Sequence, residues 1–250
     1  MDIEKYLTRI NYTGERKPSI EVLTALQKNH LLKVPFENLD IHYHQPIVLD
    51  INNFFDKIAL RNRGGFCYEL NGLFHSLLIA LGFDAAIISA RVYSKEEVYS
   101  PEYDHLAVLV KIDDKEYLTD VGFGEFAFSP LEINIGKIQH DQRGDFIVEK
   151  QEDDYYRASK SGNSQNIPEY IFMPVVRQLN EFAEMCQYHQ TNPGSHFKQK
   201  ALITMPTENG RITIADTCLK ITESGNIINE KVLDDDEYKN CLKKYFNVVS

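Results

Sequence analysis

The chain has 250 residues, of which 43% are hydrophobic and 26% charged, and its formal net charge at pH 7 is −10. This length and hydrophobic content suit one large globular domain or two to three small ones. The negative charge argues against nucleic acid as the main partner, because phosphate binding needs clustered lysine and arginine. No stretch approaches the roughly 20 apolar residues of a membrane-spanning helix, so we expect no membrane association.

The N-terminus and the cysteines indicate the expected compartment. The first ten residues, MDIEKYLTRI, mix charges into the apolar positions, unlike a signal peptide. The four cysteines are far apart and form no C-x-x-C pair: Cys67, Cys186, Cys218 and Cys241. Neither a zinc knuckle nor a dithiol redox motif is therefore expected. A reduced, cytoplasmic protein is the simplest interpretation.

The first third of the sequence is predicted to be helical. Apolar residues recur at helical spacing within 3–10 and again within 19–33, and Pro35 ends the second helix because the residue before proline avoids the α region. Residues 50–61 are predicted to form a third helix. Between Leu70 and Leu81 the leucines and a phenylalanine form one apolar stripe. Gly82 suits the position just after a helix.

From about residue 85 the apolar pattern becomes that of strands, with Gly, Pro and Asp at the turns. The predicted strands are 85–93, 105–112, 117–123, 145–149, 211–215 and 218–222. Residues 151–200 are polar and irregular and suggest only short strands. The acidic run 234–237 is predicted to begin a final helix, since carboxylates favour helix N-termini. The fold class is α+β: helices first, then an antiparallel β region, then a small mixed piece.

The segment RGGFCYELNG, residues 63–72, places Cys67 behind two glycines at the predicted start of a helix. A free thiol has a pKa of about 8.5, and a helix N-terminus or a nearby imidazolium lowers it. The glycines permit close approach of a substrate and unusual backbone angles. The free N–H groups of the first helical turn suit a developing oxyanion. We interpret Cys67 as a nucleophile; from position alone, a small buried hydrophobic residue is the alternative.

A cysteine nucleophile needs a base, and the base usually needs an orienting group. His105 begins an apolar strand, where an imidazole must find polar partners. His75 lies two helical turns from Cys67, too far for direct contact. His42 and His44 have no third ligand nearby, so we expect no metal. His105 is therefore the candidate base, with a hydrogen-bonded core histidine as the alternative.

The orienting group depends on the turn at residues 113–114. If these form a two-residue hairpin loop, His105 and Asp120 become diagonal neighbours on one face of the sheet, roughly 7–8 Å apart at the backbone. A three-residue loop would place them on opposite faces. Asp104 is the rival partner, but adjacent residues of a strand point to opposite faces.

Four motifs follow one another along the chain: VPFENLD from residue 34, RGGFCYELNG from 63, DHL from 104 and TDVGFG from 119. With these motifs the chain resembles the arylamine N-acetyltransferases. The block R-G-G-x-C-x-E-x-N is the most specific, because it fixes the glycines, the thiol and the Glu and Asn together. The resemblance is specific up to about residue 130 and only architectural afterwards.

The resemblance implies a helical bundle, a central antiparallel β-barrel and a C-terminal α/β lid, with a cysteine-protease-like core. We divide the chain accordingly into a helical domain with the nucleophile at 1–84, a β-barrel domain with the His and Asp at 85–190, and the lid at 191–250. The family implies an enzyme of xenobiotic metabolism that moves an acetyl group from acetyl-CoA to an arylamine or arylhydrazine. The mechanism would be ping-pong, through an acetyl-cysteine, with no metal.

The resemblance also implies the site residues. Cys67, His105 and Asp120 would be the catalytic triad. Residues that match the acceptor pocket are Phe36, Val92 and Phe123, with Phe197 a looser match. Gly124 lies where the glycine-rich loop of the family approaches the CoA phosphates. We further expect Glu37 and Arg63 to form a buried ion pair.

Other functions use the same triad. A protease-like or transglutaminase-like cysteine hydrolase differs in whether water or an amine takes the acyl group, which depends on exclusion of water. An amide synthase that closes macrocycles is another reading. A degenerate binding module is disfavoured, because all three triad residue types are present. The physiological acceptor, the acyl chain of the donor and the oligomeric state stay open.

Overall fold

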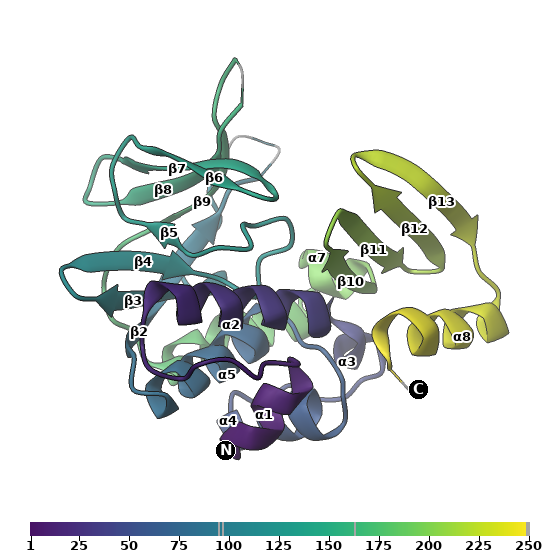
Figure 1. The fold of residues 1–250 in the computed structure, drawn as a ribbon. Coiled ribbons are helices and arrows are strands. Elements are labelled where there is room, and N and C mark those ends of the chain that lie inside the picture. The colour runs from purple at the N-terminus through teal and green to yellow at the C-terminus, as the bar shows by residue number, and fades with distance from the viewer. Residues whose placement is uncertain (95, 97, 163, 249–250) are drawn as a thin grey trace.

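The computed structural model of the chain describes residues 1–94, 96, 98–162 and 164–248. Its N-terminal part is helical, as the apolar spacing predicts (Figure 1). The helices are α1 (Ile3–Arg9), α2 (Ile20–Lys33), α3 (Leu39–His42), α4 (Ile51–Phe55), the π-helical turn η1 (Asp56–Leu60), α5 (Cys67–Ala80), the 3₁₀ turn η2 (Leu179–Phe182), α6 (Ala183–Thr191), α7 (His196–Gln199) and α8 (Asp235–Phe246).

The strands form two antiparallel sheets, one of eight strands in the order β5-β4-β3-β2-β9-β8-β7-β6 and one of five in the order β1-β10-β11-β12-β13. Their bounds are β1 (Phe36–Glu37), β2 (Asp84–Val92), β3 (His105–Ile112), β4 (Lys115–Thr119), β5 (Leu131–Glu132), β6 (Ile138–Asp141), β7 (Gly144–Lys150), β8 (Tyr156–Lys160), β9 (Ile167–Phe172), β10 (Leu202–Thr207), β11 (Gly210–Ala215), β12 (Cys218–Glu223) and β13 (Asn226–Val232).

The eight-stranded sheet curls into a nearly closed barrel (Figure 1). Its two outer strands, β5 and β6, are joined through one side chain. Gln139 of β6 accepts a hydrogen bond from the N–H of Glu132 at 2.8 Å and donates to its carbonyl at 2.9 Å. This amide satisfies a stretch of edge backbone that would otherwise face solvent. The α+β class with a helical part and an antiparallel barrel is thereby confirmed.

The five-stranded sheet is tied to the helical region by its first strand. β1 belongs to the VPFE motif and pairs with β10, with Phe36 opposite Thr204 and Glu37 opposite Ile203. The helix α8 packs on the same sheet, where Leu242 and the sheet residues form a small core of their own. The predicted start of this helix is confirmed, because Asp234 caps the N–H groups of the first turn.

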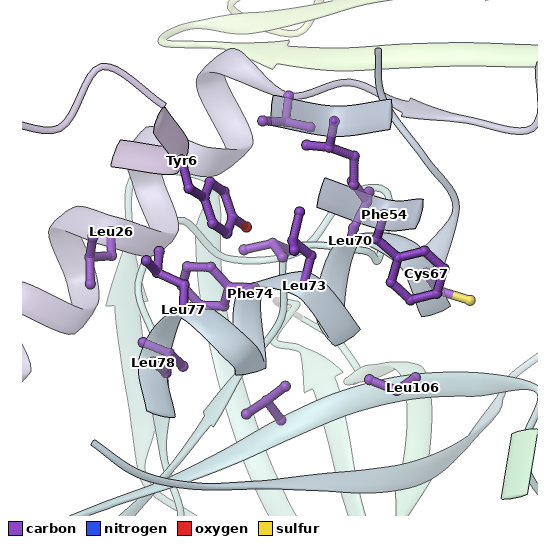
Figure 2. Packing of buried hydrophobic residues seen from close by; sticks show 14 of the residues in the cluster. Tyr6, Leu26, Phe54, Cys67, Leu70, Leu73, Phe74, Leu77, Leu78 and Leu106 are labelled. Carbon is purple, nitrogen blue, oxygen red and sulfur yellow. The ribbon is translucent and has the colours of Figure 1, made fainter. Parts of the chain in front are cut away.

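The helix α5 is the centre of the largest core cluster (Figure 2). Its predicted stripe is fully buried from Leu70 to Leu78, and Leu106 of β3 faces the same cluster. Each such side chain contributes roughly 1.5–3 kcal/mol relative to exposure to water. Gly82, with a φ of 88°, follows the C-cap residue Leu81 as predicted. Burial of the helix from Cys67 to Phe74, and again at Leu77 and Leu78, therefore fixes the position of its first residue, Cys67.

Three stretches differ from their predictions. The strand predicted at 117–123 is β4, which runs from Lys115 and already ends at Thr119. Residues 50–61 do not form one α-helix: α4 ends at Phe55 and continues as the π-helical η1, which holds Lys57 in the interior at 3% exposure. Residues 151–200 are more regular than expected, since they contain β8, β9 and α6. In α6 only Cys186 and His189 are buried, so the apolar pattern of this helix is too sparse to recognise.

Within the described residues, no helix is both long enough and apolar enough to cross a membrane.

Candidate active site

Cys67 is the first residue of α5 and is 3% exposed. The turn that carries it is held by Glu69, whose carboxylate accepts a hydrogen bond from the N–H of Phe66 at 3.1 Å. A carboxylate in the first turn of a helix also complements the positive end of the helix dipole. The predicted position of the thiol at a helix N-terminus is thus confirmed.

The two glycines before Cys67 allow close packing of backbone. A Cβ on Gly64 would lie 2.1 Å from the carbonyl oxygen of Pro35, and a Cβ on Gly65 would lie 2.8 Å from the Cβ of Glu69. Neither glycine has a positive φ, so the unusual backbone angles expected there do not occur. Glycine is required at residue 64 because Pro35 and Glu37 pack against it, and at residue 65 because the side chain of Glu69 does.

The hairpin that carries His105 has the predicted register. Ile112 pairs with Lys115, so residues 113–114 form a two-residue loop, and Val108 pairs with Thr119. As a result His105 Nε2 lies 2.7 Å from Asp120 Oδ2, with both side chains buried. The ring nitrogen that faces away from Asp120 is therefore Nδ1.

Asp120 accepts four hydrogen bonds. Oδ2 accepts from His105 Nε2 and from the Tyr170 hydroxyl at 3.0 Å. Oδ1 accepts from Asn71 Nδ2 and from the N–H of Gly122, both at 2.8 Å. A buried carboxylate is costly unless such donors surround it. The four donors therefore hold this carboxylate in one orientation beside the imidazole.

Asn71 and Gly122 join the carboxylate of Asp120 to the helix α5, which begins with Cys67. Asn71 lies one turn after Cys67 on α5, and its Oδ1 accepts from the N–H of Val121 at 2.8 Å. Its Nδ2 also donates to the carbonyl of Leu106 at 2.6 Å. A Cβ on Gly122 would lie 2.9 Å from Cys67 Cα. The loop after β4 therefore rests on the backbone of the cysteine itself.

The surroundings of Cys67 do not favour an isolated thiolate. Burial raises the pKa of the thiol well above its ordinary value, and the carboxylates of Asp104 and Asp120 raise it further. A backbone hydrogen bond from Leu106 acts in the opposite direction but is outweighed. Burial therefore dominates, and the position at a helix N-terminus does not by itself lower this pKa. A thiolate here requires a cation formed beside it.

Three of the four residues expected in the acceptor pocket lie near the triad. Phe123 packs edge-on against the His105 ring, with the centroids 5.2 Å apart. Phe36 and Phe197 pack against each other at 6.0 Å, and Phe197 also meets Phe66, the neighbour of Cys67, at 6.0 Å.

Val92 shares a sheet face with His105, but neither Val92 nor Phe197 lines the cavity that Phe36 and Phe123 border. It pairs with Tyr170 on β9, and Ala90 two residues earlier pairs with His105. A narrow cavity next to the loop after β4 is lined by Leu31, Val34, Phe36, Val121, Gly122, Phe123, Gly124, Thr204, Pro206 and Arg211, and not by Cys67, His105 or Asp120 themselves.

A cationic side chain in this cavity was not foreseen from the sequence. Arg211 of β11 donates to Thr204 Oγ1 at 2.9 Å and to the carbonyl of Gly124. Burial, followed by the charge of Arg143, lowers its pKa to about 10, and Glu125 acts in the opposite direction. A Cβ on Gly124 would meet no atom within 4 Å, so open space lies in front of this glycine.

A larger cavity of about 550 Å³ lies elsewhere, between α1 and the end of α8. It includes Lys5, Arg9 and Lys244, and none of the predicted site residues lines it. Strand β10 separates the two cavities, since Met205 lines this one while Thr204 and Pro206 line the other.

The expected pair of Glu37 and Arg63 is present, and it belongs to a larger buried cluster. Arg63 Nη2 lies 2.8 Å from both Glu37 and Asp40. Lys57 lies 2.7 Å from Asp40 and 3.0 Å from Glu69. Although burial favours the neutral amine, the three carboxylates raise the pKa of Lys57. The cluster links α3, η1 and the start of α5.

Comparison with known proteins agrees with this arrangement. A family model described as N-acetyltransferase matches residues 19–249. The arylamine N-acetyltransferase of Gallus gallus, pineal gland isozyme NAT-3, is 32% identical, and the match covers 99% of this chain and 94% of the relative.

Solved structures show the same fold. An arylamine N-acetyltransferase from Bacillus cereus, described as having a Cys-His-Glu catalytic triad, superposes with a TM-score of 0.92 at 25% identity over 100% of both chains. The Mycobacterium marinum arylamine N-acetyltransferase in complex with CoA gives a TM-score of 0.89 at 26% identity, over 99% of this chain and 93% of that one. The chain described here therefore belongs to the arylamine N-acetyltransferase family.

Proposed function

We propose that this protein transfers an acetyl group from acetyl-CoA to the nitrogen of an arylamine or arylhydrazine, through an acetyl group on Cys67. The observation that carries the proposal is the buried contact of His105 Nε2 with Asp120 Oδ2, beside a cysteine at the start of a helix. The Mycobacterium marinum relative was solved with CoA, which supports this donor.

In the first half-reaction, the sulfur of Cys67 attacks the thioester carbonyl while His105 accepts the thiol proton. Because burial disfavours a lone thiolate, the negative sulfur and the imidazolium form together. Asp120 keeps the proton on Nε2 and stabilises the positive ring, which leaves Nδ1 for the thiol. The C–S bond to CoA then breaks, and His105 returns the proton to the departing CoA sulfur.

In the second half-reaction, the acceptor nitrogen attacks the acetyl-cysteine. His105 takes the proton from the amine as the new C–N bond forms, and it protonates the sulfur of Cys67 as the C–S bond breaks. The N–H groups of the first turn of α5 are the candidate donors to the oxyanion of both steps. The thiol is then restored for another cycle.

The donor is proposed to enter along Gly124. This residue has open space before its Cα, and the guanidinium of Arg211 lies against its carbonyl. A buried arginine at a glycine-rich turn is suited to phosphate oxygens, which it meets as a planar set of donors. Arg211 thus supplies a cation for the polyanionic CoA in a protein whose net charge is −10.

The acceptor is proposed to be aromatic, because aromatic rings lie against His105 and against Phe66, the neighbour of Cys67. Phe123 lies against His105, and Phe36 and Phe197 lie against each other beside Phe66. Rings arranged edge-on and tilted form walls that suit a flat apolar acceptor. Val92, on the His105 face of the sheet, would extend this wall. The helical, barrel and lid divisions at 1–84, 85–190 and 191–250 are proposed to meet at this site.

The test is incubation with acetyl-CoA and no amine, followed by intact mass measurement and peptide mapping. One acetyl group is expected on Cys67, and none in Cys67→Ala. Cys186→Ala is the matched control, because it removes another buried thiol and should still be acetylated. Acetyl on a different cysteine, or on none, would refute the proposal. Loss of the acetyl group to water as fast as to an arylhydrazine would indicate a hydrolase instead.

A further inference from the structure

A second set of buried polar side chains lies beside the candidate site. His189 of α6 places Nε2 at 3.3 Å from Asp104 Oδ1, and its Nδ1 lies 3.1 Å from Ser195 Oγ. The side chain of His189 is 6% exposed and that of Asp104 is 19% exposed. The Asp104 contact is close but is not aligned as a hydrogen bond, and Nε2 has no other partner within the described residues.

Asp104 carries a charge toward this histidine. Burial alone would raise its pKa, but the contacts with His189 and Ser100 outweigh burial and lower the pKa. Asp104 is therefore a carboxylate at neutral pH. It is the residue before His105 and lies just outside β3, where it contacts His189 and Ser100 and not the donors of Asp120. The two aspartates near His105 thus have different partners.

Ser195 transmits this contact to the helix α7. Its Oγ accepts a hydrogen bond from the N–H of Phe197 at 3.3 Å and so caps that helix. Although aspartate, histidine and serine are the residue types of a serine nucleophile triad, Ser195 is 2% exposed and its oxygen is used as a cap. The three residues therefore connect the residue just before β3, Asp104, to the segment that carries Phe197.

The ring of His189 also packs on Phe197 directly. The two ring centroids are 5.0 Å apart at 83°, and Tyr68 lies 6.1 Å from the same imidazole. On its other sides Phe197 meets Phe66 and Phe36. Phe197 is thus fixed through its ring by His189 and through its N–H by Ser195.

We propose that His189 is a positioning residue that sets the specificity for aromatic acceptors, by holding Phe197 against Phe66 through its contacts with Asp104 and Ser195. The inference rests on the proposed function, because it takes Phe197 as part of the acceptor site. His189 touches neither the donor nor the reacting atoms. Its influence should therefore appear in the binding of an aromatic acceptor and not in the acetylation of Cys67.

The experiment compares two half-reactions in His189→Phe, which keeps a ring of similar size but removes both nitrogens. The rate of Cys67 acetylation by acetyl-CoA should change less than about twofold, whereas KM for an arylhydrazine should rise about tenfold with little change in kcat. Unsubstituted hydrazine, which has no ring to place, should keep its kcat/KM within about twofold. Asp104→Asn breaks the same contact without altering the ring stack and should shift the arylhydrazine KM in the same direction.

His140→Phe is the matched control, since His140 also forms a pair with an aspartate, Asp145, at 2.7 Å, but on the exposed surface. This variant should keep the wild-type values of the Cys67 acetylation rate, the KM for the arylhydrazine and the kcat/KM for hydrazine. If wild-type Cys67 is not acetylated, the proposed function itself fails. If it is acetylated but arylhydrazine and hydrazine lose kcat/KM equally in His189→Phe and Asp104→Asn, or lose none, the role of His189 is refuted.

Discussion

At the scale of single residues, Asp120 combines a buried charge with four donors. Each donor comes from a different part of the chain: Asn71 from α5, His105 from β3, Gly122 from the loop after β4 and Tyr170 from β9. An amide at this position could not accept all four bonds, since its nitrogen would face donors. The carboxylate is therefore needed both for the imidazole and for its own surroundings.

Replacement of Asp120 by Asn should slow the acetylation of Cys67 strongly. Loss of the carboxylate frees the tautomer of His105, and in a serine protease the same change costs about 10⁴-fold in kcat. We expect a loss of at least about 100-fold here, because sulfur depends on its base less than a hydroxyl does. Asp104 faces His189, so Asp104→Asn should lower the acetylation rate of Cys67 by less than about tenfold, which is about 1.4 kcal/mol of activation free energy. The time course of the intact mass measures both, and the reverse order would mean that Asp104 orients the base.

The sequence predicts the contact of His105 with Asp120 because the two lie on one hairpin. A two-residue loop fixes the register, and the register fixes the shared face. Tyr170 could not be foreseen, since it reaches Asp120 only after β9 pairs with β2. Nor could the pKa of Cys67, because burial of a thiol depends on packing from distant segments. Asn71 belongs to the motif RGGFCYELNG, and its spacing of one helical turn from Cys67 indicates that both side chains lie on the same face of the helix.

At the scale of elements, the site depends on how the loop after β4 seats on the first turn of α5. Gly122 packs against Cys67 and Asn71. A Cβ added to Gly122 would lie 2.9 Å from Cys67 Cα and 2.8 Å from Asn71 Nδ2. No real Cβ tolerates such distances, so any larger residue must lift the loop away from the helix. The loop carries Asp120, and a shift there would also move the imidazole relative to the sulfur.

Gly122→Ala should therefore lower both activity and stability. Overpacking of this kind costs about 1–3 kcal/mol, which corresponds to a fall of several degrees in melting temperature. The acetylation of Cys67 should slow by at least about tenfold, since small displacements of reacting groups are costly. Gly124→Ala is the control for folding alone, because its Cβ meets open space, and its melting temperature should match the wild type. Equal melting temperatures in the two variants would contradict the close approach.

The elements themselves were predictable to different degrees. The stripe on α5 and the hairpin of β3 and β4 are local patterns, and both appear as expected. The π-helical turn η1 was not predictable, because it exists to bring Lys57 to the carboxylates of Glu37, Asp40 and Glu69. Glu37 and Asp40 are distant in sequence, and a lysine in a helical pattern predicts a side chain that faces solvent. In η1 the pairing of Lys57 with these carboxylates accompanies a departure from the α-helical pattern.

At the scale of the whole molecule, a buried histidine couples stability to pH. His30 of α2 is fully buried between Tyr6 and Phe74, and its Nδ1 lies 2.9 Å from the Tyr6 hydroxyl. Its Nε2 has no hydrogen-bond partner within the described residues. Burial, together with the charge of Arg9, lowers the pKa of His30 to about 3. The imidazole is therefore neutral in the folded protein.

The free energy of unfolding should fall as the pH is lowered from about 6.5, the ordinary pKa of histidine, toward about 3, the pKa of His30 in the folded protein. Below its ordinary pKa of about 6.5 the unfolded chain binds a proton at His30 that the folded chain excludes, which costs up to about 1.4 kcal/mol per pH unit. Between pH 7 and pH 5, wild type should lose about 2 kcal/mol more unfolding free energy than His30→Gln. Urea unfolding at the two pH values measures this difference. His140→Gln, at an exposed site, should keep the wild-type slope; a wild-type slope in His30→Gln would show that His30 does not exclude the proton.

The wide separation of the donors to Asp120 also has a consequence for synthesis of the chain. A ribosome completes Cys67 and Asn71 early, His105 and Gly122 later, and Tyr170 only when more than half of the polypeptide has emerged. Until β9 is made it cannot pair with β2, so Asp120 lacks one donor and the sheet beside His105 stays open to water. We therefore expect the nascent chain to carry a thiol without a working base. We expect acyl transfer to begin only once β9 has paired with β2.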